Sequence, residues 1–112
     1  GQEEINNIIE RFRKNPLKDI SGSKVKYFSD YLNSSKTNLA KNTKTKINLP
    51  TSNVIEFETA EGYKLILRPS GTEPKIKIYI SVNRKLESLE KFNEVNLYLD
   101  KKLEDIINNI SL

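Results

Sequence analysis

Apolar residues near the N-terminus recur at the spacing of one face of an α-helix. Ile5, Ile8, Ile9 and Phe12 follow the i, i+3, i+4, i+7 pattern. Asn15-Pro16 ends this pattern, because a proline disfavours helical backbone at the residue before it. The spacing therefore predicts a helix over residues 2 to 14.

After the Ser21-Gly22 turn, the pattern changes to one that favours a strand. Alternate side chains share one side of it, with Val25, Tyr27, Ser29 and Tyr31 on one side and Lys24, Lys26, Phe28 and Asp30 on the other. The following residues, 33 to 48, are polar and rich in Lys, Thr and Asn, with little apolar surface to bury. We expect a mobile loop there.

Two short runs, residues 54 to 58 and 64 to 68, are predicted to form a hairpin. They are joined by Ala60-Glu61-Gly62, where the glycine can adopt a positive φ at little cost. A further run places Ile76, Ile78, Ile80 and Val82 on one side and Lys77, Tyr79 and Ser81 on the other, which is typical of a half-buried strand. The segment between these last two strands is therefore expected at one edge of a sheet.

A long amphipathic helix is predicted at the end of the chain. Ser88 can cap it, and its apolar positions recur at steps of three and four residues: Phe92, Val95, Leu99, Leu103, Ile106 and Ile110. This stripe needs an apolar partner, and the sheet face is the surface of matching length. We predict a single α+β domain over residues 1–112, an antiparallel sheet of about four strands with two helices packed on one face.

Composition narrows the chemistry that such a domain can perform. The 112 residues include no Cys and no His, which excludes thiol nucleophiles, imidazole bases and soft-metal sites. The acidic residues are scattered among lysines, so we expect no metal site in this chain. A net charge of +4 allows anionic partners. Since the chain contains no Met and starts at Gly1, we expect it to be a fragment of a longer protein.

The stretch LILRPSGTEPKIKIYI, residues 65 to 80, contains the candidate site. Arg68, Ser70, Gly71 and Thr72 concentrate guanidinium donors, two hydroxyls and exposed backbone amides in a short loop, and all of these are anion-binding groups. Prolines at 69 and 74 restrict the backbone on either side, so the donors would be arranged before a ligand binds. The alternative is a purely structural turn, in which the hydroxyls bond their own backbone and Arg68 pairs with Glu73.

The sequence RPSGTEPKIKIYI, preceded by LPTSNVIEF, closely resembles the C-terminal, fourth domain of the α-D-phosphohexomutases, the superfamily of phosphoglucomutases and phosphomannomutases. The resemblance implies a TATA-box-binding-protein-like fold and an isomerase that interconverts hexose 1-phosphate and hexose 6-phosphate through a bisphosphate intermediate. In that family the last domain grips the substrate's non-reacting phosphate, and Arg68, Ser70, Gly71 and Thr72 are the matching positions. The catalytic phosphoserine and the Mg²⁺-binding aspartates belong to other domains, so the resemblance implies no catalytic or metal residue here and no activity for this domain alone.

The same resemblance implies the partners. They are a hexose phosphate substrate and the other domains of the same cytoplasmic enzyme, with neither nucleic acid nor membrane involved. Two alternatives remain open from the residues themselves. One is a basic nucleic-acid-binding module that uses the sheet face and the lysines of residues 36 to 46. The other is a scaffold domain with a structural loop.

Overall fold

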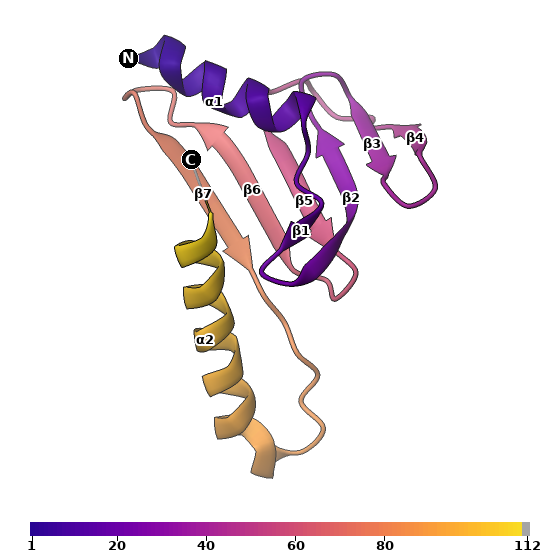
Figure 1. The fold of residues 1–112 in the computed structure, drawn as a ribbon, viewed down its shortest axis with the longest axis vertical. Helices are drawn as coiled ribbons and strands as arrows, with labels where there is room; N and C mark the ends of the chain where they lie inside the picture. The colour runs from indigo at the N-terminus through magenta and orange to yellow at the C-terminus, as the bar shows by residue number, and fades with distance from the viewer. Residues whose placement is uncertain (111–112) are drawn as a thin grey trace.

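The computed structural model describes residues 1–110, which form one antiparallel sheet with two helices (Figure 1). The elements in chain order are α1 (Gln2–Lys14), β1 (Asp19–Ile20), β2 (Ser23–Asp30), β3 (Ser35–Asn38), β4 (Thr43–Lys46), β5 (Ile55–Thr59), β6 (Lys64–Pro69), β7 (Ile76–Ser81), the 3₁₀ turn η1 (Leu89–Lys91) and α2 (Phe92–Asn109). The predicted α+β class and the single antiparallel sheet are confirmed. Among the described residues no helix has the length and apolar character needed to cross a membrane.

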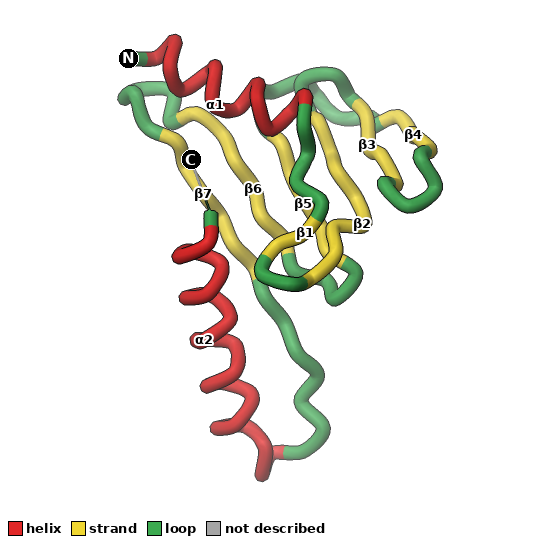
Figure 2. Tube along the Cα trace, viewed as in Figure 1, coloured by secondary structure: helices red, strands yellow, loops and turns green. Residues whose placement is uncertain are grey.

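The sheet has more strands than the four or so predicted. Its seven strands run in the order β4-β3-β2-β5-β6-β7, with the short β1 paired to β2 (Figure 2). The apolar side chains of its middle strands form the core against both helices, and the fully buried members include Ile55, Phe57, Leu65 and Leu67, with Ile9 from α1 and Ile106 from α2. Because these side chains share one core, both helices lie on the same face of the sheet. We call the other face, which no helix of residues 1–110 covers, the open face.

The predicted loop over residues 33 to 48 is wrong, because most of it forms the β3–β4 hairpin. Ser34 and Asn42 adopt positive φ angles of 54° and 52° at the turns, and Thr37 and Leu39 pack toward the core. Both strands are short and polar; β4 is the edge strand and is exposed along its whole length, and β3 lies next to it. Edge strands need little apolar surface, so hydrophobic periodicity does not reveal them.

The prediction of which β2 side chains share a face of the sheet is wrong for the first half of the strand. The pairing with β5 shifts between Val25 and Tyr27, so that Lys26 is an extra residue in the strand. This bulge reverses the alternation, and Val25, Phe28 and Asp30 all lie on the helix-covered face. Phe28 packs on Phe57 with ring centroids 5.1 Å apart. Tyr27, Ser29 and Tyr31 remain together on the open face.

The C-terminal helix packs on the sheet mainly through its last turns. Ile106 is fully buried and Ile110 is half-buried, whereas Phe92 near the start of α2 is 55% exposed. Figure 1 shows α2 extending beyond the lower end of the sheet. Ser88 precedes η1 and forms no side-chain cap, so the predicted cap is wrong. The predicted apolar stripe of α2 therefore packs on the sheet only near the end of the helix.

Polar contacts hold α2 beside the sheet where its apolar packing ends. Tyr98 of α2 and the buried Tyr63 share a hydrogen bond between their hydroxyls, and Tyr63 also donates to Glu61 at 3.0 Å. Burial, followed by these two bonds, raises the pKa of Tyr63, which keeps its hydroxyl protonated. Lys102 donates to the backbone carbonyl of Ser21 at 2.8 Å.

Replacing Tyr98 by Phe is expected to lower the free energy of unfolding by about 0.5 to 1.5 kcal/mol, because Tyr63 loses a hydroxyl partner in a buried setting. Amide hydrogen exchange should become faster along α2 before it changes in the sheet. Urea denaturation measures the first effect, and Tyr31→Phe on the open face is the matched control. Equal exchange rates in α2 of both variants would contradict this role for Tyr98.

Candidate functional site

The candidate site is the turn between β6 and β7, at one end of the edge hairpin. Arg68 and Pro69 are the last residues of β6 and pair with Lys77 and Ile76 of β7. Beyond them the backbone closes on itself, because Ser70 N–H donates to the Lys75 carbonyl at 2.9 Å. The predicted position of the loop, between two strands at a sheet edge, is confirmed.

Gly71 supplies the backbone shape of this turn. Its φ of +88° lies in the left-handed region, which side chains disfavour. A Cβ built on it would meet no atom within 4 Å, so the glycine serves the turn conformation and the space beside it is open. A ligand can therefore approach the main chain at this point.

Arg68 lies on the open face and is held there by Tyr79. Its Nη2 donates to the Tyr79 hydroxyl at 3.0 Å, and its Cζ lies 5.6 Å from the centre of the Tyr79 ring. This hydrogen bond lowers the pKa of Tyr79, and the charges of Arg68 and Lys77 act in the same direction against a partial opposing effect of burial. Since a guanidinium has five N–H donors, those not used by Tyr79 remain for a ligand.

The contacts expected of a purely structural turn are not formed among residues 1–110. Glu73 pairs with Lys75 at 2.9 Å, and within residues 1–110 Arg68 forms no ion pair. Over the same residues, the hydroxyls of Ser70 and Thr72 make no hydrogen bond to the protein. The side-chain donors of the turn are therefore largely uncommitted.

The turn carries an excess of positive charge. Arg68 and Lys77 are direct neighbours across the β6–β7 pair, and Lys75 immediately precedes β7. Glu73 is the one carboxylate within the turn itself, and its ion pair with Lys75 is exposed to solvent. An anion binding here would meet a net positive field.

Tyr79 is the residue of this site that the sequence did not single out. The signal was present in the strand alternation, which places Lys77 and Tyr79 on the same side of β7. Because β6 and β7 are antiparallel, that side is also the side of Arg68. The pairing register, which decides that Arg68 reaches Tyr79, comes only from the fold.

Across the described part of the chain, no three acidic side chains converge at a spacing that could hold a metal ion. Glu56 and Glu58 of β5 both lie on the open face, separated by one residue of the same strand. Residues 1–110 therefore offer no set of carboxylates that fits Mg²⁺.

Sequence comparison relates the chain to known enzymes. It is 51% identical over 82 residues to the phosphoglucomutase of Staphylococcus aureus strain USA300 and, over the same length, to that of the bovine strain RF122 / ET3-1. The phosphoglucomutase of strain MRSA252 is 49% identical over 82 residues. The chain is therefore similar to phosphoglucomutases over most of its own length.

The chain matches only a small part of the length of these phosphoglucomutases. It covers 73% of this chain and 15% of each of the three relatives. A continuous stretch of 82 residues in a chain of 112 must include residues 31 to 82, so the turn from Arg68 to Thr72 lies in the matched part. No family model and no solved structure matches the chain, so the likeness to the TATA-box-binding-protein fold stays a prediction.

Proposed function

We propose that this chain is the phosphate-binding domain of a phosphohexomutase, and that the turn from Arg68 to Thr72 grips the phosphate of a hexose phosphate that is not being transferred. The observation that carries this proposal is the state of Arg68. It has no carboxylate partner among residues 1–110, and its orientation is set by Tyr79. A guanidinium buried against its own protein would not support this function.

The donors of the turn match the needs of a phosphate dianion. The free edge of the Arg68 guanidinium offers paired N–H groups, which suit two phosphate oxygens at once. In this proposal the Ser70 and Thr72 hydroxyls and the backbone amides near Gly71 would bind the remaining oxygens. Hydrogen bonds to charged groups contribute about 1.5 to 3 kcal/mol each, so a few of them suffice for specific binding.

This role fits a reaction in which the transferring groups lie elsewhere. The complete enzyme would interconvert hexose 1-phosphate and hexose 6-phosphate through a bisphosphate, and this domain alone would be inactive. Binding energy from the remote phosphate would orient the sugar for transfer at its other end. Because the turn recognises phosphate rather than sugar, either phosphate of the intermediate could occupy it. Any Mg²⁺ that the reaction uses would be held by residues outside this chain's described part.

Binding to the isolated chain tests the site directly. We expect glucose 6-phosphate and inorganic phosphate to shift the amide resonances of residues 68 to 77 in an NMR titration. Arg68→Ala should abolish these shifts, and Arg68→Lys should retain only part of the affinity, because an ammonium lacks the paired geometry of the guanidinium.

The control for this titration is Arg11→Ala, which removes the same charge from an exposed position on α1. If Arg11→Ala and Arg68→Ala weaken binding equally, the effect is one of net charge and the proposed site is wrong. The proposal also fails if glucose 6-phosphate moves resonances across the sheet but none in the turn.

A further inference from the structure

The open face carries a pocket near the β4 edge of the sheet, whereas the Arg68 turn lies at the β7 edge. The pocket has a cavity volume of about 320 Å³ and is lined by Tyr27, Lys36, Asn38, Lys41, Thr43 and Thr45. These residues come from β2, from the β3–β4 hairpin and from the turn between its strands. We call this hollow the hairpin pocket.

The strand register explains why these side chains meet. Asn38 is paired with Tyr27 on one side and with Thr43 on the other, and Lys36 is paired with Thr45. Residues directly opposite in antiparallel strands point to the same face. Lys44 and Lys46 are paired with Thr37 and Ser35, so they point to the helix-covered face instead. The hairpin thus carries four lysines. Lys36 and Lys41 line the pocket, and Lys44 and Lys46 do not.

The lining offers donors and no carboxylate. Lys36 and Lys41 form no ion pair within the described chain, and the Lys36 ammonium lies 4.5 Å from the centre of the Tyr27 ring. Asn38 uses its amide oxygen to accept from the backbone N–H groups of Ala40 and Lys41, both at 3.1 Å. Its amide nitrogen is the group left for a ligand, so Asn38 acts as a donor here.

Two carboxylates of β5, Glu56 and Glu58, lie one strand beyond the pocket, and neither lines it. Glu58 lies opposite Tyr27 on β5, but its carboxylate is 3.7 Å from the ammonium of Lys64 on the far side. Lys26 adds a further positive charge, with its ammonium 5.3 Å from the centre of the Tyr27 ring. The charges around the pocket therefore favour an anion.

We propose that the hairpin pocket is a second anion site, which binds the phosphate group of a small phosphate ester. Lys36, Lys41 and the Asn38 amide would hold the phosphate oxygens, and the organic part of the ester would lie along the Tyr27 ring. The volume falls at the lower end of the range for small-molecule sites, which suits a monophosphate.

The hairpin pocket is separate from the Arg68 turn. Strands β2 and β5 lie between β3 and β6, which at about 4.8 Å per strand step places the two sites roughly 14 Å apart across the sheet. Glu56 and Glu58 of β5 lie on the open face between them. This acidic strip interrupts the positive surface, which favours a small ligand over a nucleic acid strand running across the sheet.

The test uses the full 112-residue chain carrying Arg68→Ala, so that phosphate binding at the Arg68 turn does not contribute to the signal. Phenyl phosphate and inorganic phosphate are titrated at low salt while the amide resonances of residues 27 and 36 to 45 are followed by NMR. Phenyl phosphate is expected to shift them with a dissociation constant in the millimolar range. Inorganic phosphate should bind more weakly if the Tyr27 ring holds the organic part.

The chain offers a matched control within the same hairpin. The double variant Lys36→Gln, Lys41→Gln should weaken phenyl phosphate binding about tenfold or more, which corresponds to loss of about 1.4 kcal/mol. The double variant Lys44→Gln, Lys46→Gln removes the same charge on the other face and should bind as before. The spectrum of each variant outside the hairpin reports whether it folds, and Tyr27→Leu gives a second route to weakened ester binding if the lysine variant does not fold.

Three results would overturn the proposal. The first is equal weakening by both double variants, which would mean general attraction to positive charge. The second is the absence of any shift in residues 36 to 45 with either phosphate. The third is a response to single-stranded RNA with none to phenyl phosphate, which would assign the surface to nucleic acid.

Discussion

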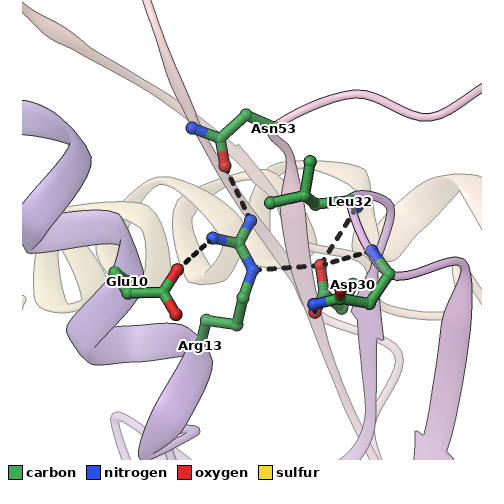
Figure 3. A network of polar contacts seen from close by, with 6 residues as sticks. Glu10, Arg13, Asp30, Leu32 and Asn53 are labelled. Atoms are coloured by element: carbon green, nitrogen blue, oxygen red, sulfur yellow. Dashed lines mark hydrogen bonds and ion pairs between the residues drawn. The ribbon is translucent and has the colours of Figure 1, made fainter.

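Arg13→Ala is expected to destabilise the fold by about 3 to 5 kcal/mol, because it leaves a buried carboxylate without its charged partner. The Arg13 side chain is 7% exposed and that of Asp30 is 6% exposed. Arg13 Nε donates to Asp30 at 3.0 Å, while its two terminal nitrogens donate to Glu10 and to Asn53, both at 2.7 Å (Figure 3). One guanidinium thus connects α1, the end of β2 and the segment before β5.

The remaining partners of Asp30 do not replace Arg13. The carboxylate also accepts from the backbone N–H of Leu32 at 3.1 Å and from the side chain of Asn33 at 2.6 Å. These are neutral donors, so the charge would stay uncompensated in a site with little access to water. Urea denaturation of Arg13→Ala measures the loss.

Arg11→Ala, on the exposed side of the same helix, should change the free energy of unfolding by no more than about 0.5 kcal/mol. A similar small change in Arg13→Ala would show that the network contributes little to stability.

The same network makes stability depend on pH. Burial alone would raise the pKa of Asp30, but the hydrogen bonds from Asn33 and Arg13 and the Arg13 charge together lower it below its ordinary value of 3.8. Since the folded pKa is the lower one, the stabilisation is present above the unfolded pKa and is lost as pH falls through the folded pKa. The gap in unfolding free energy between the native chain and Asp30→Asn should therefore shrink below about pH 4. A constant gap between pH 6 and pH 2 would contradict this assignment.

Arg68→Ala in the complete polypeptide that carries this chain should reduce kcat/KM for a hexose phosphate by about 30- to 900-fold, which corresponds to about 2 to 4 kcal/mol of lost transition-state stabilisation. On the proposed function, the guanidinium would supply paired, charged hydrogen bonds to the remote phosphate, and these would orient the sugar for transfer. Steady-state kinetics with glucose 1-phosphate measures the effect.

Two further variants separate charge from geometry at this site. Arg68→Lys keeps the charge and should retain activity between those of the native and Ala proteins. Tyr79→Phe keeps both the guanidinium and the ring but removes the hydrogen bond that orients Arg68, so it should cost less than Arg68→Ala. Unchanged kcat/KM in Arg68→Ala would remove the turn from the mechanism.

Several elements could be predicted because their signals are local. The spacing of Ile5, Ile8, Ile9 and Phe12 and the proline at 16 give α1 the bounds that the structure shows. The glycine at 62 adopts a φ of +89° in the β5–β6 turn, as a hairpin there requires. The anion-binding groups of the candidate site lie within five consecutive residues, so no long-range contact was needed to bring them together.

Other features escaped prediction because they depend on partners distant in the sequence. Residues 33 to 48 lack periodicity, yet they form strands because β2 offers them an edge to pair with. Arg13 and Asp30 are 17 positions apart, and charged residues are expected at the surface from sequence alone. Only the tertiary packing shows that they are buried together.

The amino-acid sequence by itself determined the helix and strand segments with strong periodicity, the α+β class and the composition of the Arg68 turn, since these follow from short-range spacing and backbone preference. Only the tertiary structure decided which face each strand presents, that Tyr79 holds Arg68 and that a hairpin of lysines and threonines closes a pocket over Tyr27. The physical reason is that register and the β2 bulge are set by pairing and burial across the whole sheet, and a shift of one residue moves every side chain of a strand to the opposite face.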